Sequence, residues 1–226
     1  MAERIPGVHG QDLPRYSIEE YLEFLEVAEF KHEYRDGYIV AMTGGTATHN
    51  QLVRQLHMML ASRLRAPCAW RGSETAVFVR SRNRVFFPDA SIVCGTPRLY
   101  PTRLELLENP AVIFEVLSPG TAGYDGGEKF DFYMQLPSLR EYVLISPYAP
   151  RVEYRRRQGD TTTWTLGEVA GMDADLPLTA ADCTIDLATL YDGVDFTPRP
   201  PEPDLRVVQE PDGIARYLEA YRLAYG

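Results

Sequence analysis

Two acidic residues stand alone in stretches that otherwise have the composition of buried strands. Asp89 lies within "RVFFPDASIVCG", and Glu115 lies within "AVIFEVLSP". Burying a carboxylate without a partner costs several kcal/mol, so a buried acid is paired, hydrogen-bonded or bound to a metal. We therefore expect each of these two carboxylates to face a positively charged group.

The spacing of the two acids allows their carboxylates to meet. Glu115 follows Asp89 by 26 residues, which suits neighbouring strands joined by "TPRLYPTRLELLENP". Converging carboxylates repel each other unless a cation lies between them, and Mg²⁺ and Mn²⁺ prefer oxygen ligands. The pair thus predicts a divalent metal site. In the alternative, each acid caps a loop or pairs with an arginine. The arginines nearest in the sequence are Arg71, Arg80, Arg82 and Arg84.

A lysine follows these acids at a useful position. Lys129 comes 14 residues after Glu115, within "YDGGEKFDFYMQL", where Phe130 and Tyr133 give an apolar helical stripe. Residues four apart lie on the same side of a helix, so Lys129 lies at the margin of the stripe that ends in Tyr133. From there its ammonium can reach a water or a phosphate oxygen beside the metal. A solvated helix lysine is the alternative.

These residues and their surroundings resemble the PD-(D/E)XK nuclease superfamily, and most closely its Uma-type restriction endonuclease family. The resemblance covers about residues 15–195 and is carried by "HEYRDGYIVAMTGGTATHN", "FFPDASIVCG" and "AVIFEVLSPGTAGYDGGEKFDFYMQLPSLREYVLISP". In the wider superfamily the lysine stands two residues after the second acid, where this chain has Leu117. The Uma-type branch places it on the following helix, which matches Lys129.

The resemblance implies roles for several residues. It implies Asp89 and Glu115 as ligands of Mg²⁺ or Mn²⁺, with the backbone carbonyl of Val116 as a further ligand. It implies Lys129 as a catalytic lysine. It also implies that Glu33, in "KHEYRDG", is an acidic member of the site that completes the coordination or binds a second metal through water.

Two histidines and one aspartate flank the implied site. His49 occupies the family's "H-N" position at the start of a helix, where it would bind a phosphate or a metal-bound water, or instead pack beside the helix terminus. We expect His57 to be structural. Asp125 precedes the lysine helix, where an acid is favoured electrostatically, so we expect a mainly structural residue with a role in the site left open.

The elements that must position these residues follow from hydrophobic periodicity and turn signals. Ser17 and Glu20 form a capping box that opens a helix over residues 17–29, and Asp36-Gly37 indicates a tight hairpin. "TATHNQLVRQLHMMLASRL" predicts a second helix with Leu52 and Leu56 on its apolar stripe. A third helix carries Lys129 and ends at Pro137.

Short segments rich in β-branched and aromatic residues make up most of the remaining chain, and strands outnumber helices. The sequence predicts an α+β, restriction-endonuclease-like fold, with a mixed β-sheet flanked by helices and additional β-hairpins. The strand segments are "CAWRG", "TAVFVR", "RVFFPDASIVCG", "AVIFEVLSP", "EYVLISP", "RVEYRRR" and "TTTWTLGEVA".

The C-terminal region has a different composition. We expect residues 1–196 to form the nuclease domain and residues 197–226 to form a Pro-rich linker followed by an amphipathic helix. The apolar stripe of that helix would pack either on its own domain or on a partner subunit. Since many restriction-type nucleases cut both strands as dimers, we expect a homodimer.

The net charge of −9 disfavours a high-affinity reader of nucleic acid sequence, because Lys and Arg contacts to phosphates supply most of such affinity. A modest basic stripe is expected in "RVEYRRR", where alternation puts Arg151, Glu153, Arg155 and Arg157 on one face; the alternative is a solvated strand face. We therefore expect a weak or structure-selective nuclease, with DNA as the expected nucleic acid.

The cysteines and the N-terminus bear on the compartment. Cys68, Cys94 and Cys183 are widely spaced and form no CxxC motif, so we expect buried, reduced thiols. The N-terminus lacks the apolar core of a signal peptide, and no apolar run is long enough to span a membrane. These features predict a cytoplasmic protein.

Together these observations predict a divalent-metal-dependent endonuclease that hydrolyses phosphodiester bonds. The first alternative is a catalytically inactive module that keeps the nuclease fold and binds DNA or another partner. The second is a hydrolase of small phosphorylated molecules, since "MTGGTATHN" places glycines before a helix and could bind an anion. That segment lacks the lysine of a P-loop, so its signal for a nucleotide is weak.

Overall fold

The computed structural model describes residues 14–42, 44–101, 106–118, 125 and 127–196. The chain divides into two compact units, Met1–Val194 and Asp195–Gly226. The predicted Pro-rich linker and C-terminal helix, residues 197–226, lie outside the described residues. All the elements below belong to the first unit.

The N-terminal helix and hairpin form where the sequence predicts them. Helix α1 spans Ile18–Val27, and the Ser17 and Glu20 side chains cap its first turn reciprocally. Strands β1 (His32–Arg35) and β2 (Tyr38–Ala41) form an antiparallel hairpin. Asp36 and Gly37 have φ values of 51° and 94°, the left-handed conformation that an Asp-Gly turn provides at low cost.

Helix α2 spans Ala47–Arg63 and begins beside the candidate site. The Thr46 side chain caps it by accepting a hydrogen bond from the His49 amide. Its buried apolar residues recur at helical spacing, as predicted; they are Leu52, Leu56, Met59 and Leu60. The N-terminal end of α2 therefore has a fixed position relative to the sheet on which this stripe packs.

The central sheet is mixed and has the strand order β12-β11-β10-β9-β6-β3. Strands β9 and β10 pair in parallel, and every other pair in this sheet is antiparallel. The strands are β3 (Cys68–Gly72), β6 (Ala90–Cys94), β9 (Val112–Val116), β10 (Glu141–Ile145), β11 (Arg151–Arg157) and β12 (Trp164–Ala170).

A second sheet contains the β1–β2 hairpin and has the order β2-β1-β5-β4-β8-β7. Its further strands are β4 (Val77–Val79), β5 (Arg84–Phe86), β7 (Leu99–Tyr100) and β8 (Leu106–Leu107), and the 3-10 helix η1 (Arg80–Arg82) separates β4 from β5.

The stretch "RVFFPDASIVCG", predicted as one strand, is divided between the two sheets. Its first part is β5 of the second sheet, and its last part is β6 of the central sheet. Pro88 lies at the break; it has no N–H to donate to a ladder, which favours the interruption. Asp89 therefore lies where the chain passes from one sheet to the other.

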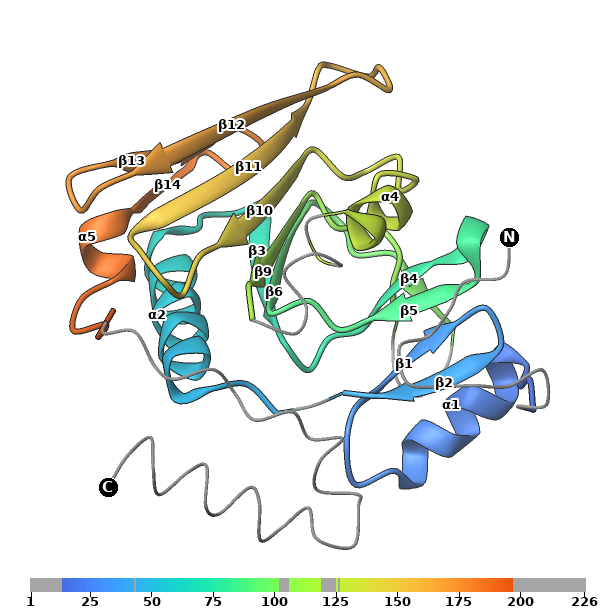
Figure 1. The fold of residues 1–226 in the computed structure, drawn as a ribbon. Helices are drawn as coiled ribbons and strands as arrows, with labels where there is room; N and C mark the ends of the chain where they lie inside the picture. The colour runs from blue at the N-terminus through green and yellow to red at the C-terminus, as the bar shows by residue number, and fades with distance from the viewer. Residues whose placement is uncertain (1–13, 43, 102–105, 119–124, 126, 197–226) are drawn as a thin grey trace, which may run out of the picture. The chain divides into compact units, whose positions relative to one another are not determined.

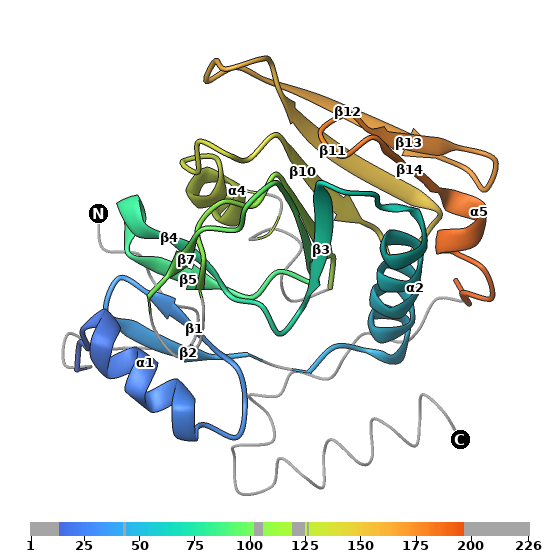
Figure 2. The same ribbon diagram turned by 180° about the vertical axis from the view of Figure 1, so that it is seen from behind.

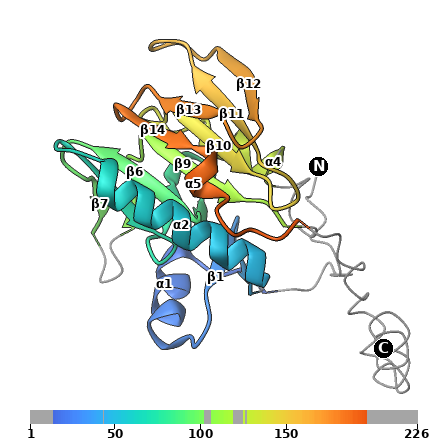
Figure 3. The ribbon, with the colours of Figure 1, turned by 90° about the vertical axis from the view of Figure 1, so that its left-hand side faces the viewer.

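Helices cover both faces of the central sheet. Helix α2 contacts β3, β6 and β9 on one face, and Figure 3 shows it lying across the sheet. Helix α4 (Glu128–Tyr133) lies on the other face, as Figures 1 and 2 show. There Phe130 and Tyr133 join Ile113 of β9 and Tyr142 of β10 in one core cluster. The mixed sheet flanked by helices confirms the predicted α+β class.

The remaining elements extend the fold beyond β12. Strands β13 (Asp175–Leu178) and β14 (Cys183–Asp186) form an antiparallel pair, and helix α5 (Leu187–Leu190) follows directly. Helix α5 contacts α2. Among the described residues, no helix is long and apolar enough to cross a membrane. The cytoplasmic location stays a prediction.

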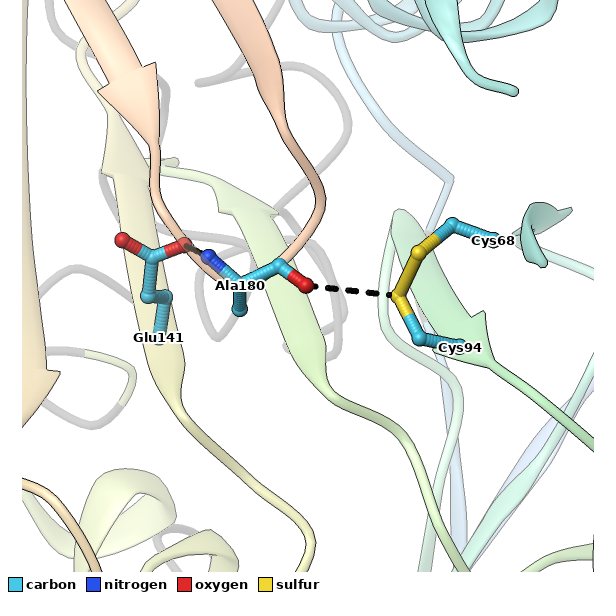
Figure 4. Close-up of a disulfide and its surroundings, with 4 residues drawn as sticks. All are labelled: Cys68, Cys94, Glu141 and Ala180. Atoms are coloured by element: carbon cyan, nitrogen blue, oxygen red, sulfur yellow. Dashed lines mark hydrogen bonds between the residues drawn. A yellow bond between two sulfur atoms is a disulfide. The ribbon is translucent and has the colours of Figure 1, made fainter. Parts of the chain in front are cut away.

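The prediction of three reduced cysteines is wrong. A disulfide joins Cys68 to Cys94 with an S–S distance of 1.99 Å, while Cys183 is a buried free thiol. The two bonded residues are directly opposite each other in the antiparallel β3–β6 register, which their spacing in the sequence could not reveal. Figure 4 shows the Ala180 carbonyl oxygen beside Cys94, 3.4 Å from its Sγ. The disulfide crosslinks edge strand β3 to β6.

Candidate active site

Asp89 is held at the N-terminal end of β6, next to the C-terminal end of β9. Ala90 pairs with Phe114 in the antiparallel register, so the preceding residue, Asp89, comes alongside Glu115. The Val116 amide donates a 2.7 Å hydrogen bond to Asp89 Oδ2, which fixes the carboxylate at this junction. The sheet thus brings together the two acids that are 26 residues apart in the sequence.

Glu115 contacts Lys129 directly. The Lys129 Nζ lies 2.7 Å from Glu115 Oε1, and both side chains are only 5% exposed. The Tyr133 hydroxyl donates to the same oxygen at 3.3 Å. Since Lys129 and Tyr133 are one helical turn apart on α4, the packing of that helix on the sheet delivers both groups to Glu115.

Two more acids surround the Lys129 ammonium. Glu33 Oε1 lies 3.5 Å from Lys129 Nζ, and Asp125 Oδ1 lies 3.6 Å from it. The guanidinium of Arg35 donates to the other oxygen of Glu33, at 3.1 Å from Nε and 2.7 Å from Nη2. Glu33 and Arg35 both belong to β1, so the N-terminal hairpin supplies one side of the site.

Negative charge is in excess around this lysine. Burial raises the pKa of Glu115 well above its usual range; Lys129 opposes this shift, while Asp125 and Asp89 add to it. Burial alone would lower the pKa of Lys129, but the surrounding acids, Glu115 above all, raise that pKa well above its usual range. Both shifts have the direction expected for a buried cluster with more acids than bases.

His49 lies on the more open side of the site. Its Nε2 is 3.3 Å from Asp89 Oδ1, and the exposed fractions of the two side chains are 16% and 15%. Burial lowers the pKa of His49, but the hydrogen bond to Asp89 and the charge of Asp89 outweigh burial, so the pKa is raised. Solvent therefore reaches His49 and Asp89 more readily than it reaches Lys129.

His57 fixes the backbone of Asp89. Its Nε2–H donates to the Asp89 carbonyl oxygen at 2.7 Å, and its ring packs on Trp70 with centroids 4.8 Å apart. This contact from the middle of α2 agrees with the structural role that the sequence predicts for His57.

A solved structure of another protein has a similar fold. A crystal structure described as "a putative nuclease belonging to DUF820" from Anabaena variabilis superposes with a TM-score of 0.59 at 17% sequence identity, covering 78% of this chain and 97% of that chain. That likeness shows a shared fold.

Two curated relatives come from Synechocystis sp., and both are named as uncharacterized proteins. The protein sll1609 is 32% identical over 158 residues, covering 70% of this chain and 89% of the relative. The protein slr1290 is 29% identical over 184 residues, covering 81% and 95%. The pattern of the Uma2 family, described as "Putative restriction endonuclease", matches residues 18–188.

The chain belongs to the Uma2 family. The match spans all the residues of the candidate site, from Glu33 on β1 to Tyr133 on α4. The predicted resemblance to a Uma-type, nuclease-like family is therefore confirmed.

The oxygen donors of this Uma2 site suit a hard divalent cation. The contacts of Asp89 with Val116 fall on Oδ2, and those of Glu115 with Lys129 and Tyr133 fall on Oε1. The second oxygens are Oε2 of Glu115 and Oδ1 of Asp89, which also lies 3.3 Å from His49 Nε2. Together with a backbone carbonyl and water, such oxygens are the donor type that Mg²⁺ and Mn²⁺ prefer. Within the described residues, no three His, Cys, Asp or Glu side chains form a metal-binding group. The fit therefore depends on two carboxylates and the excess of buried negative charge.

The site contains residues that the sequence does not predict or predicts only weakly. The contacts of Arg35 and Tyr133 are new, and Asp125, expected to be mainly structural, lies beside Lys129. Arg35 follows Glu33 by two residues on one strand, so β alternation could have placed both side chains on one face. The apolar stripe predicts the ring of Tyr133 in the core, but its hydroxyl gives no separate signal.

Two of the four arginines suggested as partners of the acids have other contacts. Arg80 pairs with Glu108 at 3.2 Å, and Arg71 donates to the Trp70 carbonyl oxygen at 3.2 Å. The cation found beside Glu115 is instead Lys129. The acid, acid and lysine of the predicted arrangement therefore lie at one place, and their roles stay predictions.

The arginines of the basic stripe predicted on β11 make contacts with other groups of the protein. Arg157 donates to the carbonyl oxygens of Leu139, Met134 and Leu136 at 2.8–2.9 Å. Arg155 lies over the Phe130 ring, 4.2 Å from its centroid. Arg151 pairs with Glu153. These contacts support the alternative interpretation of this strand, a structural face, more than a phosphate-binding surface.

Proposed function

We propose that this Uma2 protein is a divalent-metal-dependent nuclease that hydrolyses phosphodiester bonds, with DNA as the expected substrate. The observation that carries the proposal is the convergence of Asp89, Glu115 and Lys129 at the junction of the two sheets, with 2.7 Å between Glu115 and Lys129. These residues come from three separate segments, and the fold brings them together although Glu115 and Lys129 are only 5% exposed, which carries a cost of desolvation.

In the proposed mechanism, Asp89 and Glu115 hold Mg²⁺ or Mn²⁺, with the Val116 carbonyl as a further ligand. When bound, such an ion polarises the scissile phosphate and lowers the pKa of a coordinated water. Lys129 orients Glu115 through their direct contact and stabilises the negative charge that develops on the phosphate. Glu33, fixed by Arg35, holds the Lys129 ammonium from the side of β1.

His49 has the most accessible position for contact with a substrate. Its Nε2 lies beside Asp89 Oδ1, and the two side chains are more exposed than Glu115 and Lys129. We assign His49 the binding of a phosphate oxygen or of the attacking water. Asp89 keeps the ring oriented through its Oδ1, 3.3 Å from Nε2, so that the ring can donate to a phosphate oxygen.

The test compares the purified full-length protein with its Asp89→Asn variant on single- and double-stranded DNA and on RNA, each with Mg²⁺ or Mn²⁺. We expect cleavage by the wild type and a loss of about 10²-fold or more in the variant, since a metal ligand is removed. Intact substrates in every wild-type reaction, or equal cleavage by Asp89→Asn, would contradict the proposal.

The second candidate function is a non-catalytic module with a nuclease fold. It is favoured by the 5% exposure of Glu115 and Lys129 and by the internal contacts of the β11 arginines. Calorimetric titration with Mn²⁺ separates the two functions, because the enzyme must bind metal at Asp89 and a binding module need not. The predicted homodimer remains a proposal that sedimentation analysis tests.

A further inference from the structure

We infer that Lys129 and the divalent metal ion compete for Glu115, so that the ammonium weakens metal binding and thereby sets the metal concentration at which the site fills. This inference rests on the proposed function and deepens it. It assigns Lys129 a regulatory effect on metal affinity in addition to any role toward the phosphate.

The first step is the direct contact. Lys129 Nζ lies 2.7 Å from Oε1 of Glu115, a carboxylate proposed to bind the metal. A divalent ion on the same carboxylate would be close to a full positive charge, and the repulsion is strong because both side chains are only 5% exposed. The Tyr133 hydroxyl donates to the same oxygen, so Oε1 is held toward helix α4 and the ammonium.

The second step is that the ammonium has alternative partners. Glu33 and Asp125 lie 3.5 Å and 3.6 Å from Nζ, slightly beyond the distance to Glu115. Since Arg35 holds Glu33 in place through two hydrogen bonds, a carboxylate is present to receive the ammonium when Glu115 turns toward a metal. Lys129 can therefore release Glu115 to a metal while its ammonium stays paired with Glu33 or Asp125.

The third step is that Lys129 cannot easily withdraw into solvent. The residue is buried, and its neighbours Phe130 and Tyr133 pack in the core. Its Nζ also lies 5.7 Å from the centroid of the Phe86 ring. The positive charge thus remains within the site whichever acid it contacts, and the metal must bind against it.

The experiment measures the Mn²⁺ affinity of the full-length protein by calorimetry without nucleic acid. The variants are Lys129→Met, which removes the charge and keeps most of the length of the unbranched side chain, and Lys129→Arg, which keeps the charge. We expect Lys129→Met to bind Mn²⁺ about tenfold more tightly than the wild type, or more, because a unit charge near the ion is removed. We expect no gain in Lys129→Arg. Asp89→Asn serves as the control that loses binding.

The outcomes separate this inference from the proposed function. If neither the wild type nor any variant binds Mn²⁺, the metal-dependent function is wrong, and the inference is wrong with it. If the wild type binds Mn²⁺ and Lys129→Met binds it equally or more weakly, only the inference is overturned. Should Lys129→Met not fold by itself, folding on addition of Mn²⁺ supports the inference, and failure to fold with Mn²⁺ overturns it.

Discussion

At the scale of single residues, the site depends on how each carboxylate is stabilised. Asp89 accepts from the Val116 amide, and Glu115 accepts from Lys129 and Tyr133. Glu115 thus has Oε1 fixed by the protein, and Asp89 has Oδ2 fixed by Val116 while His49 lies 3.3 Å from its Oδ1, so the orientation of both carboxylates is set by the protein. A metal site with two carboxylates needs such orientation, because few ligands are available to define its geometry.

Replacing Tyr133 with Phe tests this orientation. The change removes the hydroxyl that donates to Glu115 Oε1 and keeps the ring that packs in the core. We expect nuclease activity to fall about tenfold, in line with the loss of a partner that orients a metal ligand. The free energy of unfolding should change by only about 1 kcal/mol. Cleavage assays and thermal unfolding measure the two effects.

The control for this prediction is Tyr142→Phe. Tyr142 belongs to the same core cluster, but its hydroxyl donates to the backbone carbonyl of Asp125 at 2.9 Å. A smaller loss of activity is expected than for Tyr133→Phe. An unchanged rate in Tyr133→Phe would show that this hydroxyl does not position Glu115.

At the scale of elements, strand β6 has the central position. It follows Asp89, pairs with β9 on one side and β3 on the other, and is joined to β3 by the Cys68–Cys94 disulfide. His57 of α2 donates to the backbone of Asp89 from the helix that covers this part of the sheet. A strand, a helix and a crosslink thus all fix the segment that presents the first acid.

The disulfide predicts a measurable effect on stability. Under non-reducing conditions, Cys68→Ser should lower the free energy of unfolding by about 3–4 kcal/mol, the value that loop-closure entropy gives for the 26-residue separation. Thermal unfolding with and without a dithiol reductant measures it, and the reductant should affect only proteins that retain both cysteines.

Cys183→Ser is the matched control, because Cys183 is a buried free thiol. This variant should still respond to the reductant. Thiol titration of the unfolded wild-type protein should give one reactive cysteine before reduction and three after it. Three thiols before reduction, in protein purified without reductant, would contradict the crosslink.

At the scale of the whole molecule, two features limit the positively charged surface that could bind phosphates. The net charge is negative, and arginines of β11 are engaged in contacts within the protein. The net charge is −9, and Arg157 donates to backbone carbonyls that follow α4 and precede β10. The arginine therefore connects β11 to the segment between the lysine helix and the next strand. Its role in this protein is to hold the chain that follows Lys129.

The Arg157→Ala variant should consequently be less stable than the wild type. We do not expect it to lose nucleic acid binding selectively. We expect a loss of roughly 2–3 kcal/mol in the free energy of unfolding, since charged hydrogen bonds to backbone carbonyls are lost. Arg151→Ala, on the same strand and face but paired on the surface with Glu153, should cost less than about 0.5 kcal/mol. Denaturant unfolding compares them; equal losses would contradict this assignment.

Local patterns in the sequence determined much of this protein. The Ser17–Glu20 capping box, the Asp36-Gly37 turn and the stripe of α2 all act over a few residues, so their chemistry is visible in the sequence. The candidate acids were also recognisable, because a lone carboxylate in an apolar strand needs a partner wherever it lies. The helix predicted to carry Lys129 is present as α4.

Only the tertiary structure decided which groups meet. The break of one predicted strand into β5 and β6, the pairing of Cys68 with Cys94, and the contacts of Arg35 and Tyr133 with acids of the site all depend on register and packing. These contacts join residues by strand pairing and by the docking of α4. Local periodicity specifies which face a side chain occupies, but not the partner it finds there.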